Sequence, residues 1–395
     1  METRVDFGDA RVVITGASGF VGGYLAARLM ELGSTIYGID RWKSEPARLL
    51  EKRSEDSKGN FKPVSGNLRD ISSLANVIAE AQPDYVFHLA AQSFVPESFR
   101  NPVDTMTINS LGTCNLLEAA RKTDSDAVIV FAGSSEQYGL VLTNENQYRR
   151  VLEKYGSIFP EPEKIPELPI SEKNPLRPMS PYAVSKVSGD FMSRNYYHVY
   201  GLPTIVSRAF NHEGAGRGEN FVTSIITRQV AQLQYGERES IVLGNVEAFR
   251  DWSHVSDIVE GYLLLATKGK FGEVYNQGSQ RTNSVLAYLL LSLEMANKKP
   301  TSLKTLNDSV KMDNPAELEE TEQYGLTYPT TFADRQIMDG TVSFNLEDKG
   351  LLIETEKGPV QVDFNPERFR PAEVPILLAD CAKIQNLGFE VQKSL

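Results

Sequence analysis

The chain has 395 residues and a formal net charge of −11, with 41 Lys and Arg against 52 Asp and Glu. This length allows one large or two modest domains with a full core. The acidic balance argues against a nucleic-acid-binding face, which would need clustered basic residues. Hydrophobic residues make up 41% and charged residues 24%, which is ordinary for a soluble globular protein and too apolar for a disordered one.

The remaining composition points to a reducing compartment. The two cysteines, Cys114 and Cys381, stand far apart and form neither a disulfide framework nor a metal cluster. The first ten residues carry four charges, unlike a signal peptide. The most apolar later run, Leu286 to Leu293, is too short to span a membrane. We therefore expect a cytoplasmic protein without a metal site and without nucleic-acid or membrane partners.

The predicted elements alternate between strands and helices. A β-branched run, Arg11–Thr15, is followed by a glycine-containing turn and a helix-forming stretch, Tyr24–Leu32. Further strands are expected at Ser34–Asp40, Phe61–Ser65, Tyr85–Leu89, Ala127–Ala132 and Thr204–Arg208, and further helices at Ile71–Ala81, Val103–Lys122 and Tyr182–Tyr200. This order predicts an α/β fold with a doubly wound parallel (Rossmann) sheet and right-handed crossovers.

Two stretches interrupt that alternation. Leu140–Arg177 is rich in Pro, Glu and Lys, so we expect no strand or long helix there but a long surface loop or lid, with an insertion without function as the alternative. Residues 304–340 are similarly polar. After them, residues 341–346, 351–355 and 360–364 alternate like strands of a small sheet. These strands predict a smaller C-terminal α/β domain.

A dinucleotide site is predicted at the first turn of the chain. Gly16, Gly19 and Gly22 lie between a strand and a helix, where they permit a tight turn, approach of the backbone to the phosphates and close helix packing. The helix N-terminus then offers N–H donors to a pyrophosphate. A plain turn is the alternative, but the strand before it and the helix after it favour the cofactor.

Asp40 ends the second predicted strand, where its carboxylate could accept both ribose hydroxyls of NAD. Arg41 could instead meet a 2′-phosphate, so NAD and NADP both stay open. Asn67 and Leu68 are placed to border the adenine. Leu89, Ala90 and Ala91 include the small residues needed where the backbone passes close to the cofactor. The expected cofactor-binding residues are Gly16, Ser18, Gly19, Phe20, Val21, Gly22, Asp40, Arg41, Asn67, Leu68, Leu89, Ala90, Ala91, Tyr182 and Lys186.

A catalytic group is predicted from two segments. Tyr182 and Lys186 are four residues apart and share one helix face, so the lysine cation, together with a positive nicotinamide, would lower the phenol pKa and make it a base. Ser134, Ser135 and Glu136 follow the fifth predicted strand, at the carboxyl edge of the sheet where ligands bind. We therefore predict Ser134, Glu136, Tyr182 and Lys186 as catalytic residues.

Together these features resemble the extended short-chain dehydrogenase/reductases that act on nucleotide sugars, and GDP-mannose 4,6-dehydratases in particular. The resemblance is carried by the glycine turn, the Ser134–Glu136 strand end, Tyr182 and Lys186, and by residues 88–95, 210–223, 243–245, 250–257 and 368–374. It covers roughly residues 10–139, 173–300 and 360–390. Accordingly, residues 1–207 would form the dinucleotide-binding domain, with an insertion near 140–177. Residues 208–395 would mainly bind the nucleotide sugar, with a divergent segment at 301–363 and the chain able to cross between the two.

The resemblance implies a tightly bound NAD(P) and conversion of GDP-mannose to GDP-4-keto-6-deoxymannose. Tyr182 would deprotonate O4 during C4 oxidation, Ser134 would share that hydrogen bond, and Glu136 would act at C5 as water leaves C6 and the hydride returns there. The substrate residues it implies are Ser93, Ser135, Asn211, Asn220, Arg250, Arg370 and Glu373. Arg250 would neutralise the diphosphate, with an interface salt bridge as its alternative, and Arg370 and Glu373 would hold the nucleotide. His212 and His254 are interpreted as structural.

The resemblance also implies a homodimer or homotetramer, with the loop around Arg217 able to lie at a tetramer interface. Several departures keep alternatives open. The 140–177 and 301–363 segments diverge beside the expected substrate position, and Asp40 stands where these dehydratases often lack an acid. A reductase, epimerase or decarboxylase acting on a related nucleotide sugar is the alternative activity. A cofactor-sensing regulator is a further one, although it would not need the four catalytic residues.

Overall fold

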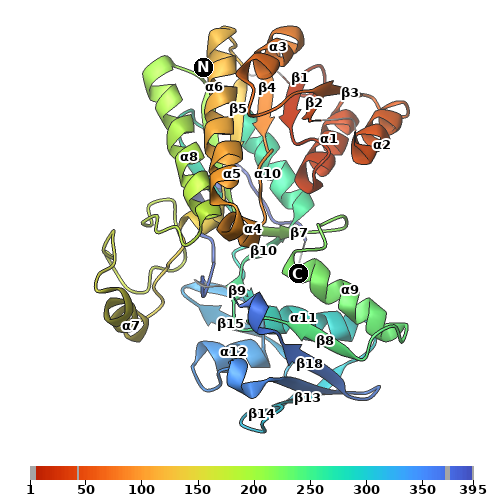
Figure 1. Cartoon of the computed structure of the whole chain (residues 1–395), viewed down its shortest axis with the longest axis vertical. Helices are drawn as coiled ribbons and strands as arrows, with labels where there is room; N and C mark the ends of the chain where they lie inside the picture. The colour runs from red at the N-terminus through yellow and green to blue at the C-terminus, as the bar shows by residue number, and fades with distance from the viewer. Residues whose placement is uncertain (1–5, 42–43, 370–373, 394–395) are drawn as a thin grey trace.

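The computed structural model describes residues 6–41, 44–369 and 374–393. Its N-terminal part contains a seven-stranded sheet in the order β3-β2-β1-β4-β5-β6-β11, in which all neighbouring strands are parallel (Figure 1). The strands are β1 (Arg11–Thr15), β2 (Thr35–Asp40), β3 (Asn60–Ser65), β4 (Tyr85–His88), β5 (Val128–Ala132), β6 (Thr204–Ala209) and β11 (Val274–Gln277). The six expected strands are confirmed within one residue at each end. The seventh, β11, was not predicted.

Helices cover both faces of this sheet, as a doubly wound fold requires. They are α1 (Phe20–Leu32), α2 (Glu45–Ser54), α3 (Ile71–Ala81), α6 (Gly112–Lys122), α8 (Pro181–Tyr200) and α10 (Val255–Lys268). Along β1, Val12 and Ile14 belong to one core cluster with α1 and α10, whereas Val13 belongs to another with α3 and α6. Successive side chains of a strand point to opposite faces, so a strand buried on both sides is apolar throughout. The predicted Rossmann architecture is confirmed.

The helical stretch expected over Val103–Lys122 is confirmed, but it contains a π-helical turn. After the short helix α4 (Val95–Arg100), it runs through α5 (Pro102–Met106) and the π-helical turn Thr107–Leu111 into α6. Asn109 in that turn is buried, and its Nδ2 donates to Ser185 Oγ at 2.9 Å and to the Gln92 carbonyl at 3.0 Å. π-Helical turns often occur near functional sites. Here the π-helical turn positions the Asn109 side-chain amide so that it bonds both α8 and the loop after β4.

The C-terminal part lies beside the end of the sheet and has its own core (Figure 1). Five strands form the order β14-β13-β17-β18-β8, and a separate hairpin pairs β15 with β16. The elements are α9 (Val222–Gln234), β8 (Ser240–Leu243), α11 (Val285–Met295), β13 (Pro300–Thr305), β14 (Lys311–Asp313), β15 (Leu318–Gln323), β16 (Leu326–Thr331), α12 (Phe332–Met338), β17 (Gly350–Thr355) and β18 (Val360–Phe364). Short pairs β7–β10 and β9–β12 lie at Asn211–Glu213, Trp252–His254, Phe249–Arg250 and Asn283–Ser284, and α13 spans Ala382–Gln385.

Two of the three strands expected near the C-terminus are confirmed as β17 and β18. The third, at residues 341–346, is not a strand. Its alternation reflects two residues that contact the C-terminal core: Val342 is partly buried, and Phe344 is buried and its N–H donates to Glu247 Oε1 at 2.6 Å. The polar stretch 304–340 instead contains β14, β15, β16 and α12. The side chains of β15 are mostly exposed, so no apolar pattern marks that strand in the sequence.

The Leu140–Arg177 insertion is more ordered than expected. It contains an eleven-residue helix, α7 (Glu145–Tyr155), which projects from one side of the molecule (Figure 1). The helix buries Val151 in a small cluster with Leu142 and Ile158. A bidentate ion pair between Glu167 and Arg177, with N–O distances of 2.7 and 2.8 Å, closes the base of the insertion. The prediction that no long helix fits there is wrong because a few apolar residues suffice for a local core.

The C-terminal segment returns to the N-terminal core. Leu377, Leu378 and Ala379 are fully buried in the cluster beneath α1 and α10, and Ile170 of the insertion pairs with Ala379 through an isolated bridge. The chain therefore crosses between the two parts more than once. Within the described ranges, every helix is too short or too polar to cross a lipid bilayer.

Candidate active site

A cleft of about 300 Å³ opens where β1 and β4 lie side by side, at the carboxyl ends of the parallel strands. The strand order reverses there, and open α/β sheets bind ligands at such a reversal. The cleft is lined by Gly16, Gly19, Phe20, Val21, Gly22, Leu89, Ala90, Ala91, Ser93, Val95, Ala132, Gly133, Ser134, Ser135, Glu136, Tyr182, Lys186, Ala209, Phe210, Asn211, His212, Arg217, Phe221 and Tyr262. All four predicted catalytic residues and ten of the fifteen predicted cofactor residues thus share one cavity.

The glycine turn leaves room for a ligand against its backbone. Gly16 has a left-handed φ of +73°, and its N–H donates to the Ile39 carbonyl at 3.0 Å. A Cβ at Gly22 would lie 2.1 Å from the Gly16 carbonyl oxygen, so no larger residue fits there. Gly19 is the N-cap of α1 and has no side chain to occupy the N–H groups of the first turn. These groups are available to a phosphate.

The loop after β4 is held against this turn by Thr15. Its Oγ1 accepts the N–H groups of Leu89 at 3.1 Å and Ala90 at 3.0 Å, and lies 2.8 Å from His88 Nδ1. Burial and the nearby Lys186 lower the pKa of His88 to about 3, so its ring is neutral. Thr15 therefore fixes the edge of the cleft where backbone and cofactor would pass closely.

Asp40 lies at the end of β2, outside the residues that line the cleft but bonded to the glycine loop. Ser18 Oγ donates to Asp40 Oδ1 at 2.7 Å, whereas Asp40 Oδ2 is buried and has no hydrogen-bond partner. Burial raises the pKa of this carboxyl group. An unpaired buried acceptor is costly and calls for a donor. The ribose hydroxyls of a dinucleotide are donors of the required kind, so these residues fit a nicotinamide cofactor.

The other predicted adenine-side residues also lie outside the cleft lining. Arg41 and Asn67 are exposed, and Asn67 Oδ1 accepts the Arg69 N–H at 3.0 Å. Leu68 is buried beside Gly112 of α6, and its carbonyl accepts from Asn115 at 2.7 Å. Asn67 and Leu68 thus stabilise the loop after β3 and its contact with α6, and their contact with adenine stays a prediction.

A tight turn at the end of β5 presents Ser134, Ser135 and Glu136 to the cleft. Ser134 Oγ accepts the Glu136 N–H at 3.2 Å, and Gln137 Oε1 accepts the Ser134 N–H at 2.9 Å. Gly133 precedes the turn and donates to the Ser207 carbonyl of β6 at 2.6 Å. The turn is thus fixed by its own side chains and by the neighbouring strand.

Tyr182 and Lys186 enter the cleft from α8. The Lys186 ammonium donates to the Ala132 carbonyl at 2.7 Å and lies 5.9 Å from the centre of the Tyr182 ring. The Tyr182 phenol is hydrogen-bonded to Ser134. α8 therefore brings the two side chains onto the same face as predicted, next to the hydroxyl of the β5 turn.

In the protein by itself Lys186 does not lower the pKa of Tyr182, and the lowering expected from Lys186 together with a positive nicotinamide stays a prediction. Burial raises the pKa of Tyr182 to about 12, and the effects that oppose this rise come from Ser134 and Arg217. Burial also lowers the pKa of Lys186 to about 8. The desolvation of both groups outweighs the attraction that their spacing suggested.

Arg217 and His212 are cleft residues that the sequence interpretation did not assign to the site. The Arg217 guanidinium lies 3.6 Å from the centre of the Phe221 ring and 5.2 Å from that of Phe20, and its Nε is 3.5 Å from Glu213. His212 stacks on Phe20 with ring centres 6.4 Å apart. Burial and Arg217 lower the pKa of His212 to about 4, so it is neutral. The sequence did offer a signal for both residues. His212 and Arg217 follow Asn211, a predicted substrate residue, in the same short segment.

The predicted substrate residues divide into three groups. Ser93, Ser135 and Asn211 line the cleft, whereas Asn220 is exposed in the turn before α9. Arg250 is buried outside the lining, and its Nη1 donates to the Phe249 carbonyl at 2.8 Å and to the Val374 carbonyl at 2.7 Å. Arg370 and Glu373 lie outside the described residues.

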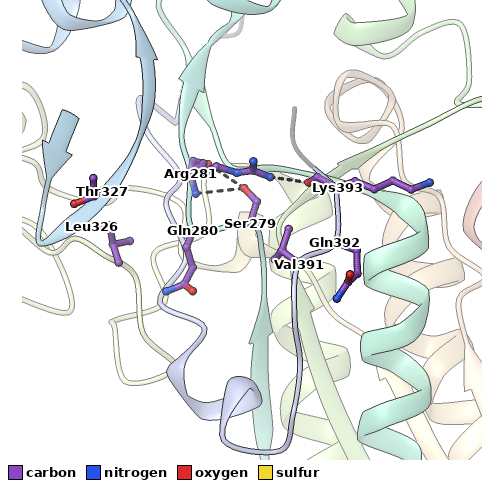
Figure 2. A pocket seen from close by; sticks show the side chains of 8 residues that line it. All are labelled: Ser279, Gln280, Arg281, Leu326, Thr327, Val391, Gln392 and Lys393. Carbon is purple, nitrogen blue, oxygen red and sulfur yellow. Dashed lines mark hydrogen bonds between the residues drawn. The ribbon is translucent and has the colours of Figure 1, made fainter. Parts of the chain in front are cut away.

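A second cavity, of about 380 Å³, lies between the loop after β11, the β15–β16 hairpin and the C-terminal segment (Figure 2). Figure 2 shows Arg281 bonded to the Lys393 carbonyl, at 2.9 Å, with Ser279 and Gln280 alongside. None of the predicted site residues lines this cavity. The chemistry anticipated from the sequence therefore gathers in the cleft at the sheet.

Comparison with known proteins agrees with this geometry. The family described as "NAD dependent epimerase/dehydratase family" matches residues 12–278. The chain is 37% identical to the GDP-mannose 4,6-dehydratase of Vibrio cholerae over 254 residues, which make up 63% of this chain and 62% of that enzyme. It is 30% identical to the GDP-mannose 4,6-dehydratase of Sinorhizobium fredii over 390 residues, or 97% of this chain and 92% of that enzyme.

Among solved structures, RMD from Pseudomonas aeruginosa complexed with NADPH aligns with a TM-score of 0.64 at 24% identity. The alignment covers 98% of this chain and 93% of that one, and it shows a shared fold. The resemblance seen in the sequence motifs is thus confirmed. The chain belongs to the NAD(P)-dependent epimerase/dehydratase family of enzymes.

Proposed function

We propose that the protein is a nucleotide-sugar 4,6-dehydratase whose substrate is GDP-mannose and whose product is GDP-4-keto-6-deoxymannose. The observation that carries the proposal is Glu136, a carboxylate in the same cleft as Ser134, Tyr182 and Lys186. A 4-epimerase or a simple reductase needs a base and a hydroxyl at C4, whereas elimination of water across C5 and C6 needs a further acid/base group. The two dehydratases of similar sequence support the choice of substrate.

The residues of the cleft supply the proton transfers. When bound, the oxidised nicotinamide would accept a hydride from C4, return it to C6 and favour the phenolate by its positive charge. Tyr182 takes the proton of the C4 hydroxyl, and Ser134 shares the same hydrogen bond because its side chain already bonds the phenol. Lys186 provides a positive charge near the Tyr182 ring, which supports the ionised phenol.

Glu136 removes the C5 proton, which the 4-ketone makes acidic, and the proton leaves with the C6 hydroxyl as water. C5 regains a proton when C6 is reduced, and the proton that Tyr182 took from O4 balances this uptake. The backbone of Glu136 is fixed by the bond from its N–H to Ser134 Oγ. Asn211, Ser93 and Ser135 border the same cavity and are suited to the sugar and the diphosphate. Arg250 is the proposed contact of the diphosphate, and Asn220 is a further proposed substrate contact. Arg370 and Glu373 are the proposed contacts at the nucleotide end, with the Glu373 carboxylate suited to the N1–H and N2 amine of guanine.

Mass spectrometry of reaction mixtures tests this proposal. Purified protein is incubated separately with GDP-mannose and with UDP-, dTDP- and CDP-glucose. Loss of 18 mass units from GDP-mannose without net consumption of cofactor is the expected result. Loss from another nucleotide sugar would retain dehydration and overturn the GDP preference. A change of 2 units with a 4-keto or 4-hydroxy sugar would instead indicate a reductase, and an unchanged mass with altered sugar stereochemistry would indicate an epimerase.

Matched variants make the test specific for Glu136. Glu136→Gln is expected to abolish the loss of 18 units, whereas Glu153→Gln, an exposed change on α7, is expected to leave it intact. Retained C4 oxidation in Glu136→Gln, seen as transient reduced cofactor, would place the block after the first step. Unchanged dehydration by Glu136→Gln would contradict the role given to this carboxylate.

We propose further that two copies of the chain associate through α5, α6 and α8. α8 packs beside the other two helices, and this surface exposes Val103 to 78%, Phe191 to 54% and Val199 to 59%. Exposed apolar side chains on one surface mark an interaction site. Light scattering should give twice the monomer mass for the wild type and the monomer mass for Phe191→Asp. Tyr235→Asp, at a still more exposed aromatic position after α9, serves as the control.

A further inference from the structure

We propose that Arg217 binds a diphosphate group in the cleft of its own chain. The inference rests on the proposed function, because that function brings two ligands with a diphosphate to this cleft, the nicotinamide cofactor and the nucleotide sugar. For Arg217 the resemblance implied only a loop able to lie at a tetramer interface. The contacts of this side chain instead connect it to the cleft that it lines.

The loop that carries Arg217 is folded against the cofactor-binding turn of the same chain. The Tyr24 hydroxyl of α1 donates to the Ala215 carbonyl at 3.0 Å. His212 stacks on Phe20, the first residue of α1, with an angle of 4° between the two rings. Both contacts involve the helix whose N-terminus is expected to bind the cofactor phosphates. The loop therefore holds Arg217 beside the phosphate-binding end of α1.

Two aromatic rings position the guanidinium of Arg217. Its central carbon, Cζ, lies 3.6 Å from the centre of the Phe221 ring and 5.2 Å from that of the Phe20 ring. The side chain is only 17% exposed. A guanidinium that lies over an aromatic ring keeps its N–H donors free, because these donors lie in the guanidinium plane. The rings thus hold the cation without using its hydrogen-bonding edge.

The guanidinium donors of Arg217 are unused by the protein. Among the residues that the structure describes, none accepts a hydrogen bond from them, and Nε is buried. Glu213 Oε2 lies 3.5 Å from this Nε and accepts the Thr223 hydroxyl at 2.6 Å instead. A buried charged donor without an acceptor is costly, so the site calls for a ligand oxygen. The planar fork of an arginine matches phosphate oxygens in particular.

The charge of Arg217 acts on the catalytic end of the cleft. Burial raises the pKa of Tyr182, and Arg217 is a cation that opposes this rise. In a nucleotide sugar, only the anomeric oxygen separates the diphosphate from the sugar ring whose C4 hydroxyl would meet Tyr182. A cation that acts on this phenol is therefore within reach of the diphosphate of a ligand that reacts there. The opposite charges of guanidinium and diphosphate favour this contact.

Calorimetric titration tests the proposal without turnover. Protein freed of nucleotide is titrated with NAD⁺ and NADP⁺, which carry the cofactor diphosphate, and with GDP and UDP, which represent that of the nucleotide sugar. In Arg217→Gln we expect the dissociation constant of at least one nucleotide to rise about 10- to 100-fold, the range for a lost hydrogen bond between charged groups. A rise for NAD⁺ or NADP⁺ alone would identify the cofactor as the ligand, and a rise for GDP or UDP alone the nucleotide sugar. Unchanged constants for all four would overturn the proposal.

Matched variants separate binding from a change in shape. Arg228→Gln removes an exposed arginine of α9 and should keep the wild-type constants. Arg217→Lys keeps the charge but loses the planar fork, so its dissociation constant should rise less than that of Arg217→Gln. The wild-type constant should also increase more steeply with salt concentration than that of Arg217→Gln, because the variant lacks one ionic contact. Equal salt dependence would show that the variant acts through its shape and would overturn the proposal.

Light scattering distinguishes this role from one at a subunit interface. The mass of Arg217→Gln should equal that of the wild type, because the guanidinium contacts its own chain. A lower mass would place the residue between subunits and overturn the proposal. The proposed function is judged separately. Binding of GDP through Arg217 without loss of water from GDP-mannose would uphold the inference and contradict the dehydratase, and dehydration with unchanged nucleotide affinities in Arg217→Gln would do the reverse.

Discussion

Gln137 and Asp190 join the two halves of the catalytic group through a buried hydrogen bond of 2.9 Å, from Gln137 Nε2 to Asp190 Oδ2. Gln137 belongs to the turn after β5 and also accepts the Ser134 N–H. Asp190 lies on α8, two turns after Tyr182, and accepts from Arg208 of β6 at 2.8 Å. The distance between Ser134 and the Tyr182 phenol is therefore set by a polar network that touches no substrate.

Replacing Gln137 should impair turnover more than binding. In Gln137→Leu, the Ser134 N–H loses its acceptor and Asp190 Oδ2 keeps only its bond from Arg208, so the β5 turn is free to shift relative to α8. We expect kcat to fall about 10- to 100-fold, equivalent to about 1.4 to 2.7 kcal/mol of barrier, with a nearly unchanged KM. Steady-state kinetics on GDP-mannose measure both values. A variant that raises KM alone would show that the network acts on substrate binding instead.

The pH dependence of the reaction should show the titration of Lys186. Burial lowers the pKa of this lysine from 10.5 to about 8, so the ammonium is present below that pH and is lost above it. Because the cation supports the ionised Tyr182 phenol, kcat/KM should decrease as the pH rises through about 8. A pH–rate profile from pH 6 to 10 measures this limb. A rate that keeps rising to pH 10 would mean that the lysine charge is not needed.

The fold should depend strongly on Asp251, which lies between β9 and β10. Its Oδ1 accepts the N–H and the hydroxyl of Ser279, and its Oδ2 accepts the N–H groups of Gln280 and Ala379, all within 3.1 Å. In Asp251→Asn, the side-chain NH2 replaces one carboxylate oxygen, and it would face two of these donating groups without being able to accept from them. We expect a loss of about 2 to 4 kcal/mol in the free energy of unfolding, measured with urea. Asp313→Asn, at an exposed position of β14, should be within about 0.5 kcal/mol of wild type.

The insertion should be opened by breaking its buried ion pair. Glu167 accepts two bonds from Arg177 and the Leu142 N–H at 2.8 Å, and both charged side chains are only 4% exposed. Glu167→Gln leaves the Arg177 guanidinium without its counter-charge, which is costly in a buried site. Limited proteolysis should then cut within residues 140–177 several times faster than in wild type or in Glu163→Gln, an exposed control. Equal rates would show that the local core around Val151 suffices to hold the insertion.

The local pattern of the N-terminal part was readable from the sequence because each signal there has a short range. β1 is apolar on both faces, α8 begins at a Ser–Pro N-terminus, and the glycine turn joins a strand to a helix. The π-helical turn at Asn109 was not readable. Its cause is a buried amide that bonds Ser185 and Gln92, both far from it in sequence or separated by a turn.

The sequence by itself determined the alternation of strands and helices, the glycine turn and the chemical types in the cleft, because these follow from neighbouring residues. Only the tertiary structure decided which of these residues meet. It placed Arg217 and His212 among the cleft residues, kept Arg250 out of the lining, and buried Tyr182, which raises the pKa of its phenol. It also joined Ser18 to Asp40 across 22 positions. The physical reason is that burial and long-range hydrogen bonds depend on packing between distant segments, which no local pattern encodes.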